Sequence, residues 1–524
     1  MHDVVIVGAG PVGLFLACEL GLAGCSVLVL EREAEPRSPF KAMPLGVRGL
    51  SAASAEAFYR RGMLDQLVTA SGGQIGPAAA GGRAGPGTAS GGQVGPGAAR
   101  AAHEAPLPRN GGHFAGMMLD PTRVDLAASP YRLPGTARRS MPTYLEAVET
   151  VLYAQAARLG VDIRHGVPVS SVTQNDEGVV ARAGEHEYAA RWLVGCDGGR
   201  STVRRLAGFE FTGTEPQFTG YAMHATVADP EKLRFGFNLT STGMYLRLTE
   251  AYIAVVDFDG GAFDRSQQLT RDHLQTVLRR VSGTDVTLSH VHLASSFTDR
   301  AMQTTTYRQG RVLLAGDAAH IHAPLGGQGL NTGIGDAMNL GWKLAATVHK
   351  HAPDDLLDTY MRERHPIGAA VLDWSRAQVA VMRPGPHGQA LQKVVRDLIG
   401  TRDGATYVAE RLSGLSVRHD LGSEHPLVGR DAPDFCLKDG THLGDLLRDG
   451  QGAVLDFGAD GDLHESARRW ASRIRYAAGP AENDLGLGAV LVRPDGTVAW
   501  AGDRAPDHEA FEQAAGRWFG APDA

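Results

Sequence analysis

The chain has 524 residues, 43% of them hydrophobic and 21% charged, and a formal net charge of −7 at pH 7. This composition is that of a globular protein long enough for several domains. The acidic balance and the scattered Lys and Arg exclude a typical binder of nucleic acid or anionic membrane. With no signal peptide and no apolar stretch of membrane-spanning length, we expect a cytoplasmic protein with neither type of partner.

The first seventy residues open with a βαβ pattern: a strand at 3–7, a helix at 11–23 and a strand at 26–30. The motif Gly8-x-Gly10-x-x-Gly13 falls at the first turn, and Glu31 ends the second strand. Glycines at this spacing let the backbone approach a pyrophosphate, which then faces a helix N-terminus. We expect a dinucleotide site, with Glu31 accepting from ribose hydroxyls and Arg32 either beside adenine or solvated. The predicted contacts at the turn are Gly8, Gly10, Pro11, Val12 and Gly13.

A low-complexity insertion follows at 71–106. Gly72-Gly-Gln-Ile-Gly-Pro recurs as Gly91-Gly-Gln-Val-Gly-Pro, a degenerate tandem duplication. Such a segment has little to bury. We expect an expanded surface loop, with an active-site lid as the alternative.

The middle of the chain changes its pattern near residue 208. Before it we expect a helix at 145–159 and strands at 161–164, 171–174, 179–183 and 192–194. Between 208 and 299, short alternating runs at 221–227, 243–248 and 252–258 predict an antiparallel sheet. After it come a strand at 311–314, a long helix at 331–349 and a helical stretch at 353–402.

A second motif, Asp197-Gly-Gly-Arg-Ser201, follows the strand at 192–194. Asp-Gly-Gly predicts a sharp turn and Ser201 a helix cap. Alone, this pattern is an ordinary strand–turn–helix junction.

The third motif joins Ala315-Gly-Asp317 to the glycine-rich run Pro324-Leu-Gly-Gly-Gln-Gly-Leu-Asn331. A carboxylate at a strand end needs hydrogen-bond donors, and backbone N–H groups at a helix N-terminus suit an anionic ring. His320 and His322 flank this run without an acid or third His at ligand spacing, so structural hydrogen bonding is the better interpretation. We predict no metal site. The four cysteines, too, show neither a CxxC pair nor metal-ligand spacing.

The last hundred residues, 425–524, form a separate block with strands at 453–457 and 488–492. Asp431-Ala-Pro-Asp-Phe435 and a late strand–turn–strand pattern predict a small thioredoxin-like domain. It has no CxxC, so it cannot perform dithiol chemistry. We interpret it as a structural cap or dimer element.

Together and in this order, the three motifs resemble those of the single-component (group A) FAD-dependent aromatic hydroxylases, closest to the phenol hydroxylase and aromatic polyketide hydroxylase branch. The resemblance implies an α/β fold with a Rossmann-like FAD-binding domain at 1–70, 107–207 and 301–400. It adds an antiparallel-sheet substrate domain at 208–300 and the thioredoxin-like domain at 425–524. The 71–106 insertion has no counterpart in it.

The resemblance also implies a reaction: NAD(P)H reduces FAD, O₂ adds to form a flavin C4a-hydroperoxide, and an aromatic polyketide takes one oxygen. Asp317 would accept from a ribityl hydroxyl, and Pro324, Gly326 and Gly327 would border the reacting oxygen as the catalytic loop. The other implied FAD contacts are Arg48, Asp197, Gly198, Gly316, Pro324, Gly327, Gly329, Leu330 and Asn331. The candidate walls of the substrate cavity are Tyr221, His224, Phe235, Phe237, Tyr245 and Arg247.

Apart from the insertion, three features depart from the family pattern. Ala53 stands where an arginine is usual, Thr143 stands where a glutamine is usual, and Lys41–Gly46 lengthens the loop after the second strand. Several alternatives therefore remain open. They are Baeyer–Villiger or epoxidising chemistry, a non-oxygenating flavin dehydrogenase or oxidase, and a non-catalytic flavoprotein. The choice of NADPH or NADH, and of monomer or homodimer, is open as well.

Overall fold

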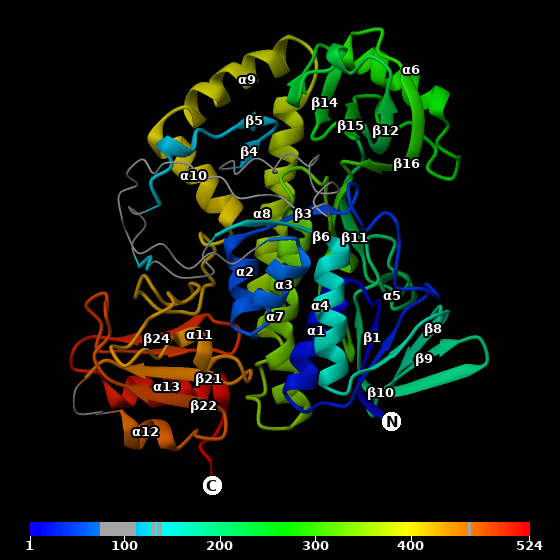
Figure 1. Ribbon diagram of the computed structural model, residues 1–524. Coiled ribbons are helices and arrows are strands. Elements are labelled where there is room, and N and C mark those ends of the chain that lie inside the picture. The colour runs from blue at the N-terminus through cyan, green and yellow to red at the C-terminus, as the bar shows by residue number, and fades with distance from the viewer. Residues whose placement is uncertain (74–111, 127–130, 134–138, 459–462, 524) are drawn as a thin grey trace, which may run out of the picture.

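The structure is a computed structural model that describes residues 1–73, 112–126, 131–133, 139–458 and 463–523. The predicted insertion at 71–106 lies outside the described residues apart from its first three. Figure 1 shows three parts: a central α/β body, an antiparallel sheet above it, and a C-terminal domain at lower left.

The central body is built on an eight-stranded sheet in the order β18-β19-β10-β1-β2-β7, with β9 paired to β10 and β8 to β9. The five strands from β19 to β7 run parallel. Such strands are covered on both faces, and Val4, Val5 and Ile6 are accordingly fully buried. The bounds are β1 His2–Val7, β2 Val27–Leu30, β7 Asp162–Arg164, β8 Ser171–Gln174, β9 Val179–Ala183, β10 His186–Gly195, β18 Arg308–Gln309 and β19 Val312–Leu314.

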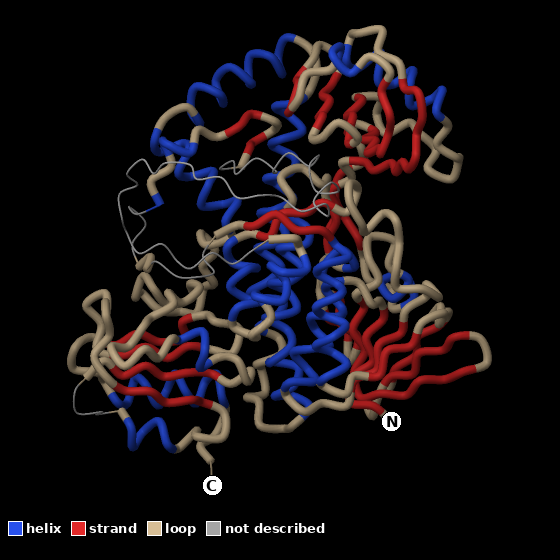
Figure 2. Tube along the Cα trace, viewed as in Figure 1, coloured by secondary structure: helices blue, strands red, loops and turns tan. Residues whose placement is uncertain are grey.

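Helices cover this sheet, as Figure 2 shows in blue. Helix α1 packs against both α4 and α7. Its contact with α7 is close because Gly341 lacks a side chain: a Cβ there would lie 2.4 Å from Cβ of Glu19. The bounds are α1 Pro11–Leu22, α2 Ala52–Tyr59, α3 Leu64–Ala70, α4 Leu145–Arg158, α5 Thr202–Leu206 and α7 Gln328–Val348.

The upper sheet is antiparallel, in the order β13-β14-β15-β12-β16. Helix α6 (Arg271–Ser282) covers one of its faces with the buried residues Leu274 and Leu278. The other face meets the short hairpin of β4 (His113–Phe114) and β5 (Met117–Met118). The strand bounds are β12 Thr219–Val227, β13 Gly236–Leu239, β14 Gly243–Arg247, β15 Tyr252–Asp257 and β16 Leu288–Thr298.

Two small sheets join the central body to the upper one. The first has the order β11-β17-β20 and the second pairs β3 with β6. The bounds are β3 Val47–Leu50, β6 Met141–Tyr144, β11 Phe211–Thr214, β17 Ala301–Thr304 and β20 His320–Ile321.

The helical stretch predicted at 353–402 is not continuous. It contains α8 (Thr359–Met382) and α9 (Pro386–Ile399), and α10 (Arg402–Ser413) follows. The break falls where Pro384 lacks an N–H and Gly385 has a φ of 100°. The end of α8 and α9 pack on the upper sheet through Met382 and Ile399, so this last part of the 301–400 segment supports the substrate side.

The C-terminal domain has its own sheet, β22-β21-β23-β24, in which only β21 and β22 are parallel. Its core is separate and includes Trp470, Leu491 and Phe511. This arrangement fits the predicted thioredoxin-like domain. The bounds are α11 Leu443–Leu446, β21 Gly452–Asp456, α12 His464–Arg468, β22 Ile474–Ala478, β23 Ala489–Val492, β24 Val498–Gly502 and α13 His508–Phe519.

The predicted α/β fold class is confirmed, with small shifts in bounds. The run at 192–194 is the end of the longer strand β10, and α7 begins three residues before the predicted Asn331. Among the described helices, none combines the length and apolarity needed to cross a bilayer.

Candidate cofactor and substrate site

The first glycine motif forms the tight turn between β1 and α1. Gly8 has a φ of 106°, and a Cβ there would lie 2.5 Å from the carbonyl oxygen of Cys196. A Cβ on Gly13 would lie 2.0 Å from the carbonyl oxygen of Gly8, whereas one on Gly10 would meet nothing within 4 Å. The turn is therefore closed on its inner side and open at Gly10, beside the N-terminus of α1.

Glu31 lies at this turn, as its position after β2 predicts. Its Oε2 accepts from the backbone N–H of Ala9 at 2.7 Å, and its Oε1 accepts from Glu33 N–H at 3.0 Å. Arg32 instead points to solvent, with its side chain 69% exposed and paired to Glu33 at 3.1 Å. The structure thus fixes the Glu31 carboxylate at the turn, while a contact of Arg32 with adenine stays a prediction.

The second motif packs against the first through its backbone. The carboxylate of Asp197 caps α5, accepting from Thr202 N–H at 2.6 Å and from Val203 N–H at 3.1 Å. Ser201 also caps α5, because its Oγ accepts from Arg204 N–H at 2.9 Å. The predicted cap is therefore present, and the Asp197 carboxylate positions the turn. A cofactor could therefore contact the backbone of this turn, which includes Gly198 at a φ of 76°.

The third motif brings Asp317 to the same region. Asp317 is exposed, and Gly316 before it has a φ of 62° and packs against Val12 of the first motif. A Cβ added to Gly329 would lie 3.7 Å from Oδ1 of Asp317. The Asp317 carboxylate and Gly329 of α7 therefore face one shared space.

His320 and His322 make the structural hydrogen bonds that the sequence favours. His320 Nε2 lies 2.8 Å from Asp336, a fully buried carboxylate that also accepts from Arg364 Nε at 2.8 Å. His322 Nδ1 lies 2.8 Å from the carbonyl oxygen of Ala323 and donates to it. Burial lowers the pKa of His322, so its ring is neutral at pH 7.

The glycine-rich loop turns into α7 through two left-handed residues, Gly326 at a φ of 78° and Gly327 at 66°. The Asn331 side chain then ties the loop to β3. Its amide donates to the carbonyl oxygens of Gly327 at 2.8 Å and Gly49 at 2.9 Å, and its oxygen accepts from Ser51 N–H at 2.8 Å. Because α7 begins at Gln328, the first N–H groups of the helix have no partner within it.

Arg48 lies on β3, the strand to which Asn331 is hydrogen-bonded. Its guanidinium donates to the carbonyl oxygens of Leu45 and Val47 at 3.2 and 2.6 Å. Burial lowers its pKa, while Tyr252 and Asp317 act in the opposite direction. Arg48 therefore lies near Asp317 of the third motif and Tyr252 of the upper sheet, and its contact with the cofactor stays a prediction.

The six predicted cavity-wall residues do not lie together, and this corrects the sequence interpretation. Tyr221 and Tyr245 belong to the core under α6, where the Tyr221 hydroxyl is 3.0 Å from His273 Nε2. Arg247 donates to the carbonyl oxygens of Pro230 and Leu233. Because strands alternate, these three point away from the glycine-rich loop.

Of the other three, Phe235 is 59% exposed, and Arg247 stacks over its ring at 4.0 Å. His224 points to the face opposite Met223, with its ring 4.7 Å from that of His292. Phe237 alone packs in the cluster that also holds Leu325 of the glycine-rich loop.

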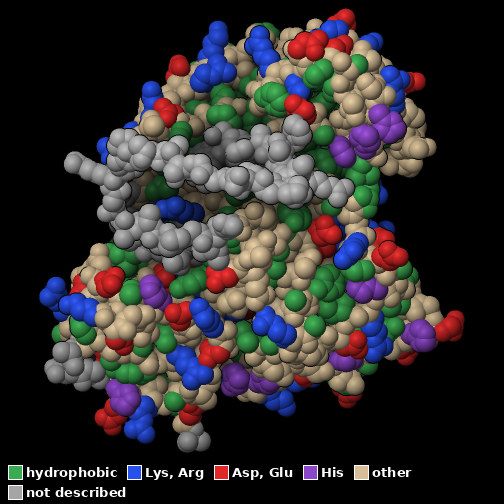
Figure 3. Space-filling model, viewed as in Figure 1, with side chains coloured by type: hydrophobic (Ala, Val, Ile, Leu, Met, Phe, Trp, Pro, Cys, Tyr) green, Lys and Arg blue, Asp and Glu red, His purple; other side chains and the backbone are tan. Residues whose placement is uncertain are grey.

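The loop and the sheet meet in a cluster of packed apolar residues that the sequence did not single out. They include Phe114, Met117, Met244, Phe297 and Leu325. Figure 3 shows the molecular surface hollowed between the upper and lower parts, with hydrophobic side chains on the upper side of the hollow.

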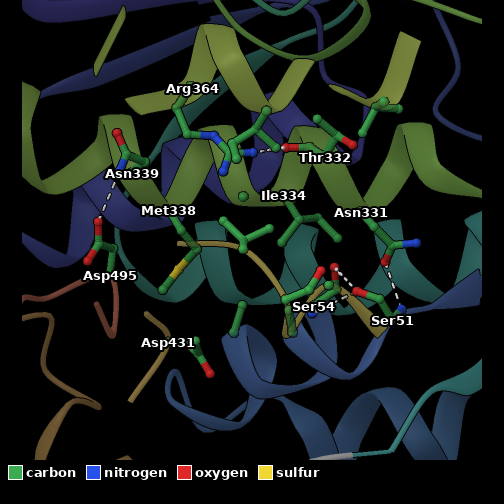
Figure 4. Close-up of a pocket in the computed structure, with 18 of the residues that line it drawn as sticks. Ser51, Ser54, Asn331, Thr332, Ile334, Met338, Asn339, Arg364, Asp431 and Asp495 are labelled. Atoms are coloured by element: carbon green, nitrogen blue, oxygen red, sulfur yellow. Dashed lines mark hydrogen bonds between the residues drawn. The ribbon is translucent and has the colours of Figure 1, made fainter. Parts of the chain in front are cut away.

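A separate cavity of about 200 Å³ lies on the other face of α7. Gly333 turns toward Val12, while Ile334 and Met338 line this cavity, across from Ser51 and Ser54 in Figure 4. Asn331 lies at its edge. The cavity therefore separates α7 from α2 and the C-terminal domain and is distinct from the glycine turn.

The glycine positions fit FAD. Gly10 and Gly329 have no side chain, so the space beside their backbone is open to a ligand. The exposed Asp317 carboxylate and the N-terminus of α7 face the space at Gly329. Comparison with known proteins decides the assignment. A family profile described as an FAD binding domain matches residues 1–375, and one described as the C-terminal part of aromatic-ring hydroxylases matches 425–522.

The chain belongs to the FAD-dependent aromatic-ring hydroxylases. A monooxygenase of Claviceps purpurea is 42% identical to it over 99% of this chain and 98% of its own length. The solved structure of the OxyS anhydrotetracycline hydroxylase from Streptomyces rimosus has a TM-score of 0.82 at 34% identity and covers 100% of both chains. A dialkyldecalin synthase of Streptomyces rugosporus is 34% identical over 99% of both chains. This hydroxylase is thus a flavoprotein monooxygenase with FAD as its cofactor, and NAD(P)H and O₂ are the co-substrates typical of such enzymes.

Proposed function

We propose that this enzyme hydroxylates an aromatic polyketide, a polycyclic phenol or quinone, with NADPH or NADH and O₂. The observation that carries the proposal is the apolar cluster between the upper sheet and the glycine-rich loop, where Phe114, Phe237, Met244 and Phe297 pack in one cluster with Leu325. A large, weakly charged ring system suits such a wall. The similarity to the anhydrotetracycline hydroxylase supports the same substrate class.

In this proposal the bound flavin supplies the chemistry that activates O₂. The protein holds the flavin, orients the substrate and shields both from water. The turn at Gly8, Gly10 and Gly13 receives the pyrophosphate, and Glu31 accepts from ribose hydroxyls. Asp317 accepts from the ribityl chain, and the N-terminus of α7 faces the pyrimidine side of the ring. Asp197 supports the cofactor site indirectly, because its carboxylate holds the turn that carries Gly198.

Pro324, Gly326 and Gly327 border the reacting ring in this proposal, and the apolar cluster excludes water from it. Of the predicted wall residues, Phe237 keeps that role and His224 remains a candidate on the same strand face as Ala222. Baeyer–Villiger insertion and epoxidation would use the same arrangement of residues and differ only in the substrate presented.

We also propose a cytoplasmic enzyme, monomeric or homodimeric. All four cysteines are free thiols, and Cys18, Cys25 and Cys196 are buried. Reduced thiols of this kind are typical of a reducing compartment.

The experiment that tests the proposed function measures NADPH and NADH consumption under ¹⁸O₂ with a panel of tri- and tetracyclic phenolic polyketides. Faster consumption with a single ¹⁸O in the product establishes monooxygenation, and the product structure separates ring hydroxylation from Baeyer–Villiger insertion and epoxidation. Consumption that no aromatic compound stimulates would contradict the proposal and favour a non-oxygenating or non-catalytic role, in line with a relative that is named a synthase.

Asp317→Ala is expected to weaken FAD binding about 30-fold, because a ribityl hydroxyl loses a charged acceptor. Asp317→Asn retains an acceptor oxygen and is expected to lose less. Titration of each apoprotein with FAD, followed by flavin fluorescence, measures both. Wild-type affinity in Asp317→Ala would refute the role given to this carboxylate.

A further inference from the structure

The hairpin of β4 and β5 ends in a tight turn that touches the upper sheet. Ala115 and Gly116 have φ values of 52° and 79°, both left-handed. A Cβ on Gly116 would lie 3.3 Å from Phe237 and from Met244. The tip therefore packs closely on Phe237 and Met244, and it borders the apolar cluster against which the aromatic substrate is proposed to bind.

A single buried amide connects this tip to the glycine-rich loop. Gln378 of α8 is fully buried. Its Oε1 accepts from the backbone N–H of Ala115 at 3.0 Å, and its Nε2 donates to the carbonyl oxygen of Leu325 at 3.4 Å. A Cβ on Gly326 would lie 3.7 Å from the same Nε2. Gln378 therefore spans from the substrate wall to the residue between Pro324 and Gly326.

The surroundings make this amide unusual. Ala115 and Leu325 both belong to the apolar cluster, as does Val379, the neighbour of Gln378 on α8. One turn earlier on α8, Trp374 stacks edge-on against Phe114 of the hairpin at 4.7 Å. Burying a carboxamide in such a place costs free energy unless its oxygen and nitrogen both find partners. A hydrophobic residue of the same length would fill the space and lose both bonds.

We propose that Gln378 is a positioning residue that sets the spacing between the substrate wall and the flavin-facing loop. One rigid amide group holds the hairpin through Ala115 and the loop through Leu325. A ring seated against Phe237 and Met244 is thereby kept at a fixed distance from Pro324 and Gly326. When this spacing relaxes, water reaches the ring and oxygen is lost as hydrogen peroxide instead of entering the product. The inference rests on the proposed function of the loop and the cluster.

Two variants separate the two hydrogen bonds. Gln378→Met has similar length and can make neither bond. Gln378→Glu keeps an acceptor for Ala115, but it donates to Leu325 only while its carboxyl group is protonated. Burial raises the pKa of a carboxyl group by several units, so protonation is expected to change within the range of pH 6 to 9. His113 on the hairpin stays neutral there, because burial lowers its pKa to about 4. Arg411 stacks on Trp374 at 5.5 Å.

The first measurement is hydrogen exchange of the hairpin peptide that contains Ala115, made on the full chain with and without FAD. Gln378→Met is expected to exchange about fivefold faster there, the effect of losing one hydrogen bond, while Gln378→Glu keeps wild-type protection. Gln392→Met is the matched control: this amide, on α9, donates to the carbonyl oxygen of Val381 on α8, and among the described residues no hydrogen bond joins it to the hairpin or the loop. Gln392→Met should leave hydrogen exchange unchanged in both the hairpin and the glycine-rich loop.

The second measurement is coupling, the product formed per NAD(P)H consumed with the best substrate of the panel. Gln378→Met is expected to retain FAD and ring-stimulated NAD(P)H consumption while coupling falls about fivefold, with hydrogen peroxide making up the difference. In Gln378→Glu, coupling should approach the wild-type value at low pH and fall as the carboxyl group ionises. The wild type and Gln392→Met should show no such pH-dependent fall.

Wild-type exchange at Ala115 together with wild-type coupling in Gln378→Met would overturn the proposal, as would a pH-independent Gln378→Glu. If the wild type oxygenated no aromatic compound, the proposed function would fail instead. The exchange measurement would still report whether Gln378 holds the hairpin.

Discussion

Gly10→Val is expected to give a folded protein without bound flavin. Gly10 has φ −76° and ψ 177°, a backbone conformation open to any residue, and no atom lies within 4 Å of where its Cβ would be. The valine side chain would therefore fit the apoprotein but occupy the space in which the pyrophosphate approaches the N-terminus of α1. We expect FAD affinity to fall about 100-fold or more, measured as flavin absorbance per chain and by titration of the apoprotein.

Two other glycines serve as controls. Gly516, in α13, also has no atom within 4 Å of its Cβ position, and Gly516→Ala should retain full flavin. In Gly13→Ala the new Cβ would lie 2.0 Å from the carbonyl oxygen of Gly8, so both FAD binding and the unfolding midpoint should fall. Full flavin content in Gly10→Val would contradict the placement of the cofactor at this turn.

Glu363→Ala is expected to destabilise the protein by about 3–5 kcal/mol, because it removes one partner from a buried ion network. The Glu363 carboxylate is 4% exposed and lies 2.7 Å from Arg493 and 3.0 Å from Lys343, and it also accepts from Asn339 at 2.7 Å. Without it, Arg493 would keep the Asp495 carboxylate at 2.6 Å, while Lys343 would lose the carboxylate that lies 3.0 Å away. Equilibrium unfolding in urea, followed by circular dichroism, measures the loss.

The neighbouring residue supplies the control. Arg362 is 60% exposed and pairs with Asp355 at 3.0 Å, so Arg362→Ala should cost less than about 1 kcal/mol. The Glu363→Ala effect should also depend on pH. Arg493 and Lys343 hold the pKa of Glu363 well below its usual value, so its contribution is complete above the pKa of an unfolded glutamate and disappears as the pH falls further. An effect of Glu363→Ala no larger than that of Arg362→Ala would contradict a stabilising network.

The parts of the site that could be predicted are those in which local sequence decides the conformation. The turn at Gly8 to Gly13, the carboxylate of Glu31 at a strand end and the Ser201 cap all depend on residues a few positions apart. Their positions in the structure follow from backbone sterics and from the unpaired N–H groups of a helix start.

The residues that could not be predicted depend on what packs against them. Alternation along β12 shows that Tyr221 and His224 face opposite sides, but only the position of α6 shows which side is the core. Gln378 is one glutamine in a long helix, and its partners are hundreds of residues away along the chain for Ala115 and tens for Leu325. The Lys343–Glu363–Arg493 network likewise joins α7 and α8 to the C-terminal domain, and no local pattern marks it.

The hydrogen bonds that join Asn331 to β3 and Ser51 have a consequence for synthesis on the ribosome. Asn331 and Ser51 are 280 positions apart, and β1 takes β10 as its second neighbour, which in turn pairs with β19. A nascent chain that carries only the glycine turn therefore has β1 unpaired on the side that later takes β10, and it has no glycine-rich loop beside that turn. We expect the cofactor site to be complete only after Asn331 of the 524 residues has been synthesised, and a prematurely terminated chain exposes apolar strands that the complete enzyme buries.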